Sequence, residues 1–117
     1  MKLSDSIREG AKKRPQCYGV LFLHHTDPSN LSGVTESCTI GAGLEGAGFL
    51  DPEKLTYPCK PDMDIETRFE GDWTVVADCL APSCIGRLSV LLMIGHLNDH
   101  HRYHREWIAD WLKRLGY

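Results

Sequence analysis

The sequence predicts a small α+β domain, in which a short β-sheet or hairpin carries a cysteine knuckle and a pair of helices forms the C-terminal end. Three observations support this prediction. The chain has 117 residues, a length typical of one domain, so we treat residues 1–117 as a single unit. Short apolar runs rich in strand-forming residues alternate with segments of helical periodicity. Two cysteines and several histidines in the last third of the chain are spaced so that they can converge on one point.

The N-terminal segment has the pattern of a short amphipathic helix. Its apolar residues recur every four positions: Leu3, Ile7 and Ala11. Ser4 or Asp5 is a suitable N-cap, because a short polar side chain can accept a hydrogen bond from the first turn. Pro15 has no amide proton and ends the helix. The apolar run at residues 17–23 then predicts a buried strand.

The middle of the chain is rich in glycine. Residues 36–48 keep a helical spacing of apolar side chains: Ile40, Leu44 and Ala47. Each glycine in such a helix costs about 1 kcal/mol relative to alanine. The motif Gly41-x-Gly43-x-x-Gly46 matches the dinucleotide-binding pattern, but no strand runs directly into it and no βαβ unit surrounds it. We therefore interpret these glycines as the face of a small-residue helix packed on the core.

The C-terminal half combines surface, strand and helix patterns. Residues 57–72 contain prolines and several charges and predict irregular surface. Residues 73–77 predict a strand, and residues 87–97, which are apolar on nearly every side, predict a buried helix. The clearest helix of the chain covers residues 104–115, and Gly116 suits the position that follows it.

The motif with the clearest chemistry is a pair of cysteines followed by a pair of histidines. Cys79 and Cys84 are separated by four residues, and His96 follows after eleven more. A short cysteine gap, a middle of roughly twelve residues and a His-x3–5-His end are typical of a tetrahedral zinc site. The pattern therefore predicts a zinc-knuckle subregion at about residues 73–115, which would stabilise a domain with a modest core.

The fourth ligand is either His100 or His101. In a continuous helix, His100 would lie about 40° from His96 around the helix axis and His101 about 140°, which favours His100. A helix that breaks at Asn98 and Asp99 would instead bring His101 into reach. Geometry alone leaves both alternatives open.

Three more cysteines accompany this pair: Cys17, Cys38 and Cys59. Cys17 and Cys38 are interpreted as small buried side chains. Cys59 is flanked by Pro58 and Lys60, so we expect it nearer the surface, as a substitute zinc ligand. In a reducing compartment, metal ligation is a stronger expectation than disulfide pairing for an odd number of cysteines.

Charge and hydropathy argue against several classes of protein. The formal net charge is −3, which gives no global electrostatic case for binding nucleic acid. The first residues lack the apolar run of a signal peptide. The longest apolar run, residues 90–94, is far too short to span a bilayer. We therefore expect a cytoplasmic protein that does not bind or span a membrane.

The segment that begins at residue 96 carries a distinctive order of residues: His96-Leu97-Asn98-Asp99-His100-His101-Arg102-Tyr103-His104-Arg105-Glu106-Trp107-Ile108-Ala109-Asp110-Trp111-Leu112. It resembles the end of a group of small, largely uncharacterised proteins encoded by tailed bacteriophages and prophages. Those proteins read His-Leu-Asn-Asp, one residue, His, a basic residue, an aromatic, then Ser/Thr-Arg-Glu and Ile-Ala-x-Trp-Leu, and many carry a Cys-Pro-x-Cys knuckle upstream. The resemblance is specific over residues 88–112 and loose elsewhere. This chain departs from it in its longer knuckle and in His104, a poorer helix cap than Ser or Thr.

The resemblance implies a phage origin, in the host cytoplasm or in the virion, and a shared fold without an established activity. It places the family's two histidines at His96 and His101. The preferred zinc ligands are therefore Cys79, Cys84, His96 and His101, with His100 and Cys59 as alternates.

The favoured functional reading is a zinc-stabilised interaction or scaffolding module that binds a phage or host protein. Four protein ligands leave no open position for a substrate, so we expect a structural metal and no enzymatic activity. The candidate binding surface consists of arginine and aromatic side chains, which commonly anchor interfaces: Arg102, Tyr103, Arg105 and Trp107. Tyr117 is a further exposed-aromatic candidate.

Two alternatives belong to other classes. A nucleic-acid-binding regulator would use a basic edge in which acidic residues are interspersed: Arg87, Arg102, Arg105, Lys113 and Arg114. A metal-dependent hydrolase would combine His24, His25 and Asp27 with the C-terminal histidines, but no His-Glu-x-x-His motif occurs.

Overall fold

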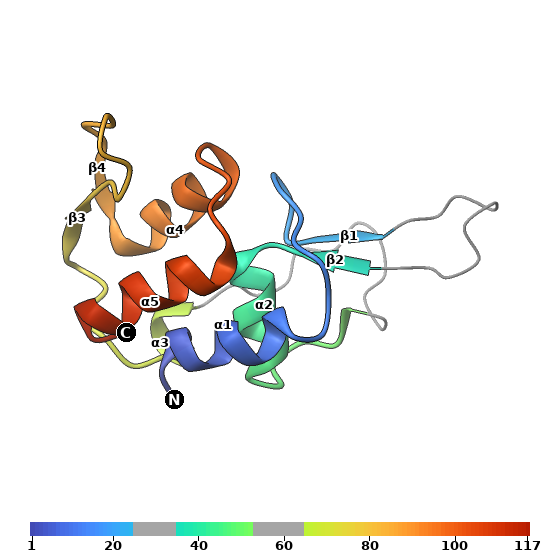
Figure 1. The fold of residues 1–117 in the computed structure, drawn as a ribbon. Helices are drawn as coiled ribbons and strands as arrows, with labels where there is room; N and C mark the ends of the chain where they lie inside the picture. Colours follow the sequence, from blue (N-terminus) through green and yellow to red (C-terminus); the bar gives the residue numbers. More distant parts are fainter. Residues whose placement is uncertain (25–34, 53–64) are drawn as a thin grey trace.

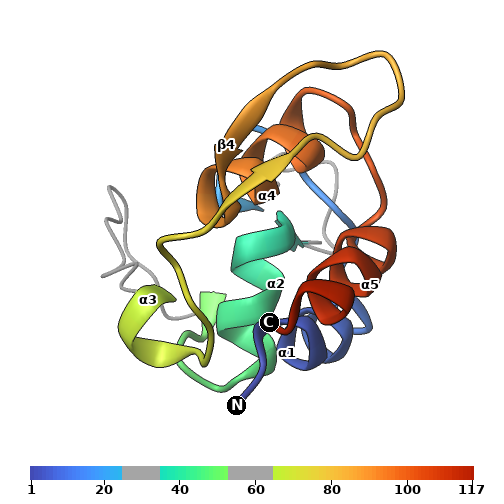
Figure 2. The same ribbon diagram turned by 90° about the vertical axis from the view of Figure 1, so that its left-hand side faces the viewer.

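Helices and two small hairpins build the domain, in agreement with the predicted α+β class. The computed structural model describes residues 1–24, 35–52 and 65–117. Within these ranges the helices are α1 (Leu3–Ala11), α2 (Thr39–Gly46), α3 (Ile65–Arg68), α4 (Val90–Asp99) and α5 (Arg105–Leu115). The strands are β1 (Phe22–His24), β2 (Thr35–Ser37), β3 (Val76–Asp78) and β4 (Arg87–Ser89), and they form the antiparallel pairs β1–β2 and β3–β4. Figures 1 and 2 show α2 between α1 on one side and α4 with the β3–β4 hairpin on the other.

Close contact between α1 and α2 explains the glycine-rich middle of the chain. A side chain added to Gly10 would collide with the backbone of Ala42, and one added to Gly46 would collide with the carbonyl oxygen of Ser6. The backbones of the two helices therefore touch, which only residues without a side chain permit. The predicted role of the glycine motif as a helix-packing face is confirmed.

The start of α1 differs from the prediction. Lys2 is the N-cap and makes no side-chain capping bond, while Ser4 and Asp5 lie inside the helix, so the predicted caps are wrong. The Ser4 hydroxyl instead donates a hydrogen bond to the backbone oxygen of Tyr117. A serine that faces the core finds a tertiary partner in place of the local amides that a cap would satisfy.

The predicted strand at residues 17–23 is wrong for most of its length. Only its last residues belong to β1, which pairs with β2. The chain before β1 bends through Gly19, whose φ of +79° lies in the left-handed region that glycine adopts easily. Cys17 and Phe22 are nevertheless buried in the core. The apolar run thus reports burial, and burial does not require a strand.

The prediction of irregular surface over residues 57–72 is wrong for the part that the structure describes. Ile65–Arg68 forms α3, and both Ile65 and Phe69 belong to the core. The Trp73 indole donates a hydrogen bond to the Phe69 carbonyl oxygen at 3.1 Å. The apolar side chains of Ile65 and Phe69 therefore pack this charged stretch against the core. Residues 57–64 lie outside the described residues.

The β3–β4 hairpin carries the cysteine knuckle and leads into α4. The strand predicted at residues 73–77 is displaced to β3, and residues 87–89, predicted to begin a helix, form β4. The helix begins only at Val90, where the Ser89 hydroxyl accepts a hydrogen bond from the Leu92 amide at 3.4 Å and caps it. One face of α4 is buried as predicted, with four side chains fully enclosed: Val90, Met93, Ile94 and Leu97. The opposite face is open, and Leu92 on it is 64% exposed.

Helix α5 matches its prediction to within one residue. It ends at Gly116, whose φ of +95° gives the left-handed C-terminal cap. Its inward stripe is completely buried: Ile108, Ala109 and Leu112. His104 occupies the N-cap position without a side-chain capping bond, as expected of histidine there. Among the helices that the structure describes, none is both long and apolar enough to cross a membrane.

Candidate metal centre

Four potential ligands from separate segments meet at the loop end of the β3–β4 hairpin. Cys79 follows β3, Cys84 lies in the loop between the strands, His96 is in the last turn of α4, and His101 follows that helix. Their ligand nitrogen and sulfur atoms all lie within 4.8 Å of one another. The fold therefore brings together the four residues that the sequence favoured as zinc ligands.

The loop between β3 and β4 is shaped by backbone hydrogen bonds. The Cys79 amide donates to the Gly86 carbonyl oxygen at 2.8 Å, and the Cys84 amide donates to the Ala81 carbonyl oxygen at 3.1 Å. The Ala81 amide donates to Cys79 Sγ at 3.5 Å, which orients that sulfur. A side chain at Gly86 would approach Cys84 Sγ to 3.3 Å and His96 Nε2 to 3.7 Å. Glycine at this position keeps one side of the ligand group clear.

The end of α4 decides between the two candidate histidines. The amides of His100 and His101 both donate to the His96 carbonyl oxygen, at 3.0 and 3.3 Å. A bond that spans five residues widens the last turn and brings residues five apart to the same side. His101 Nε2 lies 3.0 Å from His96 Nε2, whereas the His100 ring stacks against the His96 ring. The predicted break at Asn98 and Asp99 is wrong, because α4 continues through Asp99 and then widens.

A tetrahedral metal ion fits this group. Bonds of about 2.3 Å to sulfur and about 2.0 Å to nitrogen place the donor atoms of a tetrahedron roughly 3.3–3.8 Å apart. Cys84 Sγ lies 3.5 Å from His96 Nε2, and the two imidazole nitrogens are 3.0 Å apart. Since no ligand pair exceeds 4.8 Å, movements of about 1 Å complete the tetrahedron. The four side chains can hold a metal ion without leaving an open position.

The surroundings of the site shift the pKa values of a thiol ligand and an imidazole ligand in opposite directions. Burial, and to a smaller extent the adjacent Cys84, raises the pKa of the Cys79 thiol. Desolvation, followed by the neighbouring His96 and His100 rings, lowers the pKa of His101. His101 is therefore neutral at pH 7, the form in which imidazole binds metals, whereas Cys79 has to lose a proton. Metal binding at this site releases protons.

A chain of aromatic rings connects the metal group with the surface. The His101 ring stacks on Tyr103 at 5.9 Å between centroids, and the Tyr103 ring lies 5.9 Å from Trp107. The His104 ring meets Trp107 edge-on at 6.0 Å. Trp107 is 57% exposed. A large ring thus stands in solvent one side chain away from a ligand.

The residues of the predicted binding surface have different environments. Arg102 and Trp107 are exposed, and Tyr103 is half-buried. Arg105 is only 5% exposed, so its assignment to a binding surface and to the basic edge is wrong. Tyr117 was also expected at the surface, but it is buried against Trp73, with 4.7 Å between ring centroids.

Arg105 is buried among oxygen atoms of two other segments, which accept hydrogen bonds from its guanidinium group. Its guanidinium donates to the carbonyl oxygen and the hydroxyl of Ser37, at 3.2 and 2.8 Å. It also donates to the carbonyl oxygens of Ala11 and Arg14, at and just beyond the end of α1. A cation is favourable at a helix C-terminus, where carbonyl groups lack partners within the helix. Arg105 therefore joins α5 to α1 and β2.

Asn98 is a second structural residue, and the sequence interpretation missed its role. Its side-chain oxygen accepts hydrogen bonds from the Thr39 hydroxyl at 2.7 Å and the Thr39 amide at 3.1 Å. Its amide group donates to the Cys17 carbonyl oxygen at 3.1 Å. These bonds join the end of α4 to the start of α2 and to the turn before β1. The sequence does indicate such a role, because Asn98 follows a run of mainly apolar residues in a helix predicted to be buried. A buried polar group needs hydrogen-bond partners.

Of the alternate ligands, His100 does not join the metal group within the described part of the chain. His24 ends β1, while His25, Asp27 and Cys59 lie outside the described residues. Two other predicted core cysteines are buried: Cys17 and Cys38. The hydrolase alternative stays a prediction, because it depends on His25 and Asp27, which lie outside the described residues.

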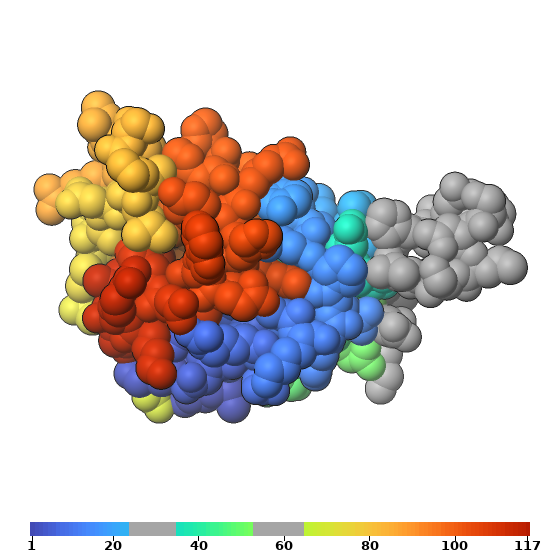
Figure 3. Space-filling view, in the orientation of Figure 1, coloured from blue at the N-terminus to red at the C-terminus, as the bar shows by residue number. Residues whose placement is uncertain are grey.

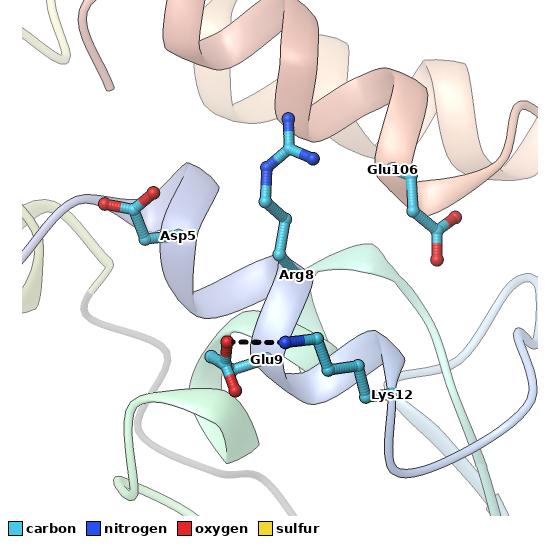
Figure 4. A pocket seen from close by; sticks show the side chains of 5 residues that line it. All are labelled: Asp5, Arg8, Glu9, Lys12 and Glu106. Carbon is cyan, nitrogen blue, oxygen red and sulfur yellow. Dashed lines mark hydrogen bonds and ion pairs between the residues drawn. The ribbon is translucent and has the colours of Figure 1, made fainter.

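In a charged groove between α1 and α5, the side chains do not converge on one point as they would in a binding site. Its volume is about 520 Å³, and its lining is Asp5, Arg8, Glu9, Lys12 and Glu106. Lys12 pairs with Glu9 at 2.9 Å, and Arg8 pairs with Asp110 of α5. Figure 4 shows the carboxylates of Asp5 and Glu106 pointing in different directions. Such exposed pairs contribute little energy, and we interpret the groove as a solvated seam between the helices.

Comparisons with known proteins assign no family. The chain matches none of the protein-family models, curated proteins or solved structures with which it was compared. The metal group and the surface around it are therefore the features of the structure on which a functional proposal can rest.

Proposed function

We propose that this chain is a phage-encoded protein-interaction or scaffolding module whose fold is stabilised by zinc. The observation that carries the proposal is the meeting of Cys79, Cys84, His96 and His101, because four protein ligands leave no position for a substrate. Two thiolates and two imidazoles in tetrahedral geometry favour zinc among the common biological metals. The resemblance of residues 88–112 to phage and prophage proteins supports the phage origin.

A structural role for the metal agrees with how little apolar surface the knuckle buries. Within residues 74–87, Ala81 is the only buried residue, and Ile85 is fully exposed. Such a segment gains little from the hydrophobic effect. The free energy of zinc binding can supply what burial does not.

The surface beside the metal supports an interaction role. Trp107 is exposed and belongs to a residue type that frequently anchors interfaces. The Tyr103 ring, which stacks on His101, lies against it. Zinc would hold this aromatic surface in place through His101. The partner is a phage or host protein, encountered in the host cytoplasm or the virion. The nucleic-acid alternative is weaker, because Arg105 is withdrawn from the basic edge.

The proposal is tested first by metal analysis of the purified native protein and of Cys84→Ser. We expect one zinc per native chain and almost none in the variant. A native protein that is folded without metal would refute the zinc part of the proposal.

The interaction role is tested by cross-linking the zinc-loaded protein in extracts of infected host cells. Trp107→Ala is expected to lose the cross-linked partner, while Leu115→Ala, a change at another exposed apolar residue of α5, retains it. A partner captured equally by both variants would contradict the aromatic surface beside the metal.

A further inference from the structure

A second hollow, the α4 groove, lies between α4 and the turn that precedes β1. Its volume is about 360 Å³, within the usual range of ligand pockets. Its walls are mainly apolar and include Gly19, Val20, Leu91, Leu92, Gly95 and Asp99. Among the described residues of the lining, Asp99 is the only charged one, in contrast with the groove between α1 and α5. The α4 groove therefore has the apolar character that the other lacks.

Gly95 opens the α4 groove from inside a helix. Glycine is disfavoured at such a position relative to alanine. The usual structural reasons are absent among the described residues: Gly95 has no positive φ, and an added Cβ would meet no atom within 4 Å. Gly10 and Gly46 differ, because any side chain there would collide with the neighbouring helix. Gly95 leaves a space that the described part of the fold does not fill.

Large apolar side chains border this space. Leu92 is 64% exposed and Val20 is 44% exposed. Each alone would be ordinary, but together with a groove lined by apolar residues they form a continuous apolar surface. Such a surface is typical of a site that is covered by a partner.

Asp99 gives the α4 groove a negative end. One of its carboxylate oxygens accepts hydrogen bonds from the Gly19 amide at 2.9 Å and from the Asn98 side chain at 2.7 Å, which hold it in place. Its other oxygen has no hydrogen-bond partner among the described residues. Arg102, three residues beyond the end of α4, lies over the Tyr18 ring and is not among the described residues that line the groove. An incoming cation can therefore bind to Asp99.

We propose that the α4 groove binds a segment of a partner protein that places a large apolar side chain over Gly95 and a neighbouring lysine or arginine against Asp99. The apolar walls suit an aliphatic or aromatic anchor, and the carboxylate disfavours an acidic peptide or a phosphate. The net charge of −3 acts in the same direction. This inference rests on the proposed interaction role and defines the chemistry of the partner.

The test uses random peptides displayed on yeast and selected on the zinc-loaded full chain, with the enriched peptides then measured as synthetic ligands. We expect them to share a large apolar residue next to a lysine or arginine. Gly95→Leu fills the groove and is expected to weaken binding at least tenfold. Asp99→Asn is expected to weaken it about threefold to tenfold, because a charge-assisted bond becomes a neutral one. Glu106→Gln removes the same charge elsewhere and should leave affinity unchanged.

A substitution in the peptide tests whether its basic residue contacts Asp99. Replacing the peptide's lysine or arginine with glutamine should abolish the difference between the native protein and Asp99→Asn. Circular dichroism and zinc content report whether each variant is folded, and Gly95→Ala provides a smaller change if Gly95→Leu does not fold. Failure to enrich any peptide, or peptides whose affinity is unchanged by either Gly95 variant, would overturn the inference. Peptides sensitive to Trp107→Ala alone would also overturn it, while leaving the proposed interaction role intact.

Discussion

The layer of α1, α2 and α5 and the β3–β4 hairpin with its ligands hold the same small chain together by different physical means. In the helical layer, apolar side chains are completely buried and two backbones touch through glycine. The hairpin lies at the edge of the molecule (Figure 3), where Ala81 is the only fully buried residue of residues 74–87 and Ala77 and Leu80 are partly buried against the core. Four potential metal ligands converge there instead. Packing spreads stabilisation over many contacts, whereas a metal site concentrates it in four bonds. The two regions should therefore fail under different perturbations.

Helix α4 connects the two regions. Met93 and Leu97 are fully buried in the core, while His96 on the same helix belongs to the metal group. The bonds of Asn98 fasten the end of this helix to α2. Loss of the metal should release the hairpin before it disturbs α1 and α2, because the helical layer keeps its own contacts.

The largest expected effect follows loss of a ligand. His101→Ala should abolish zinc binding and lower the free energy of unfolding by about 4 kcal/mol or more, as expected when a structural metal is lost. His100→Ala is the matched control and should keep zinc, because the His100 ring stacks beside the site without joining it. Urea unfolding and metal analysis measure both effects. In hydrogen exchange, His101→Ala should lose protection first in residues 74–87. Equal zinc loss in both variants would show that the widened turn does not select His101.

A smaller effect is expected in the helical layer. Gly46→Ala forces a side chain against the Ser6 carbonyl oxygen and should destabilise the fold by about 2–3 kcal/mol, typical of overpacking. Gly95→Ala makes the same chemical change in open space and should stabilise α4 by roughly 0.5–1 kcal/mol. Thermal unfolding of the two variants provides the comparison, and both should bind zinc. A similar shift in both would contradict the close contact of α1 and α2.

The smallest effect concerns pH. The buried core keeps the Cys17 thiol protonated, whereas a metal site requires its cysteines as thiolates. Burial, with a contribution from Cys38, raises the pKa of the Cys17 thiol to about 12. In the unfolded chain a thiol ionises near pH 8.5, so above that pH the unfolded state binds fewer protons than the folded state. The stabilisation is complete below about pH 8.5 and is lost as the pH rises toward 12.

We expect Cys17 to account for a loss of roughly 2 kcal/mol in unfolding free energy between pH 8 and pH 10, measured by urea titration. Cys17→Ala should show a shallower dependence over the same range. The zinc ligands behave in the opposite sense, since metal binding releases protons and is weakened by acid. A native protein and a Cys17→Ala variant with parallel pH profiles would show that this thiol is not held protonated by the fold.

Predictions based on local patterns succeeded where local physics determines the structure. The end of α5 follows from its apolar stripe and from Gly116, and α2 follows from its periodicity in spite of its glycines. The strand at residues 17–23 and the caps of α1 were wrong, because a buried apolar run can be a turn and a buried serine can bond across the fold. The prediction of irregular surface for the stretch that contains α3 was wrong because Ile65 and Phe69 pack into the core.

The sequence by itself determined the kinds of ligand, their spacing and the positions of the main helices, because these depend on residue type and short separations along the chain. Only the tertiary structure decided that the last turn of α4 widens to bring His101 rather than His100 to the group. It also decided that Arg105 is buried, since the carbonyl groups that need it come from segments distant in sequence. Gly46 and Gly95 are the same residue in similar helical patterns. The backbone of α1 lies against Gly46, whereas no described atom lies within 4 Å of a Cβ added at Gly95, and that difference arises only when the helices pack.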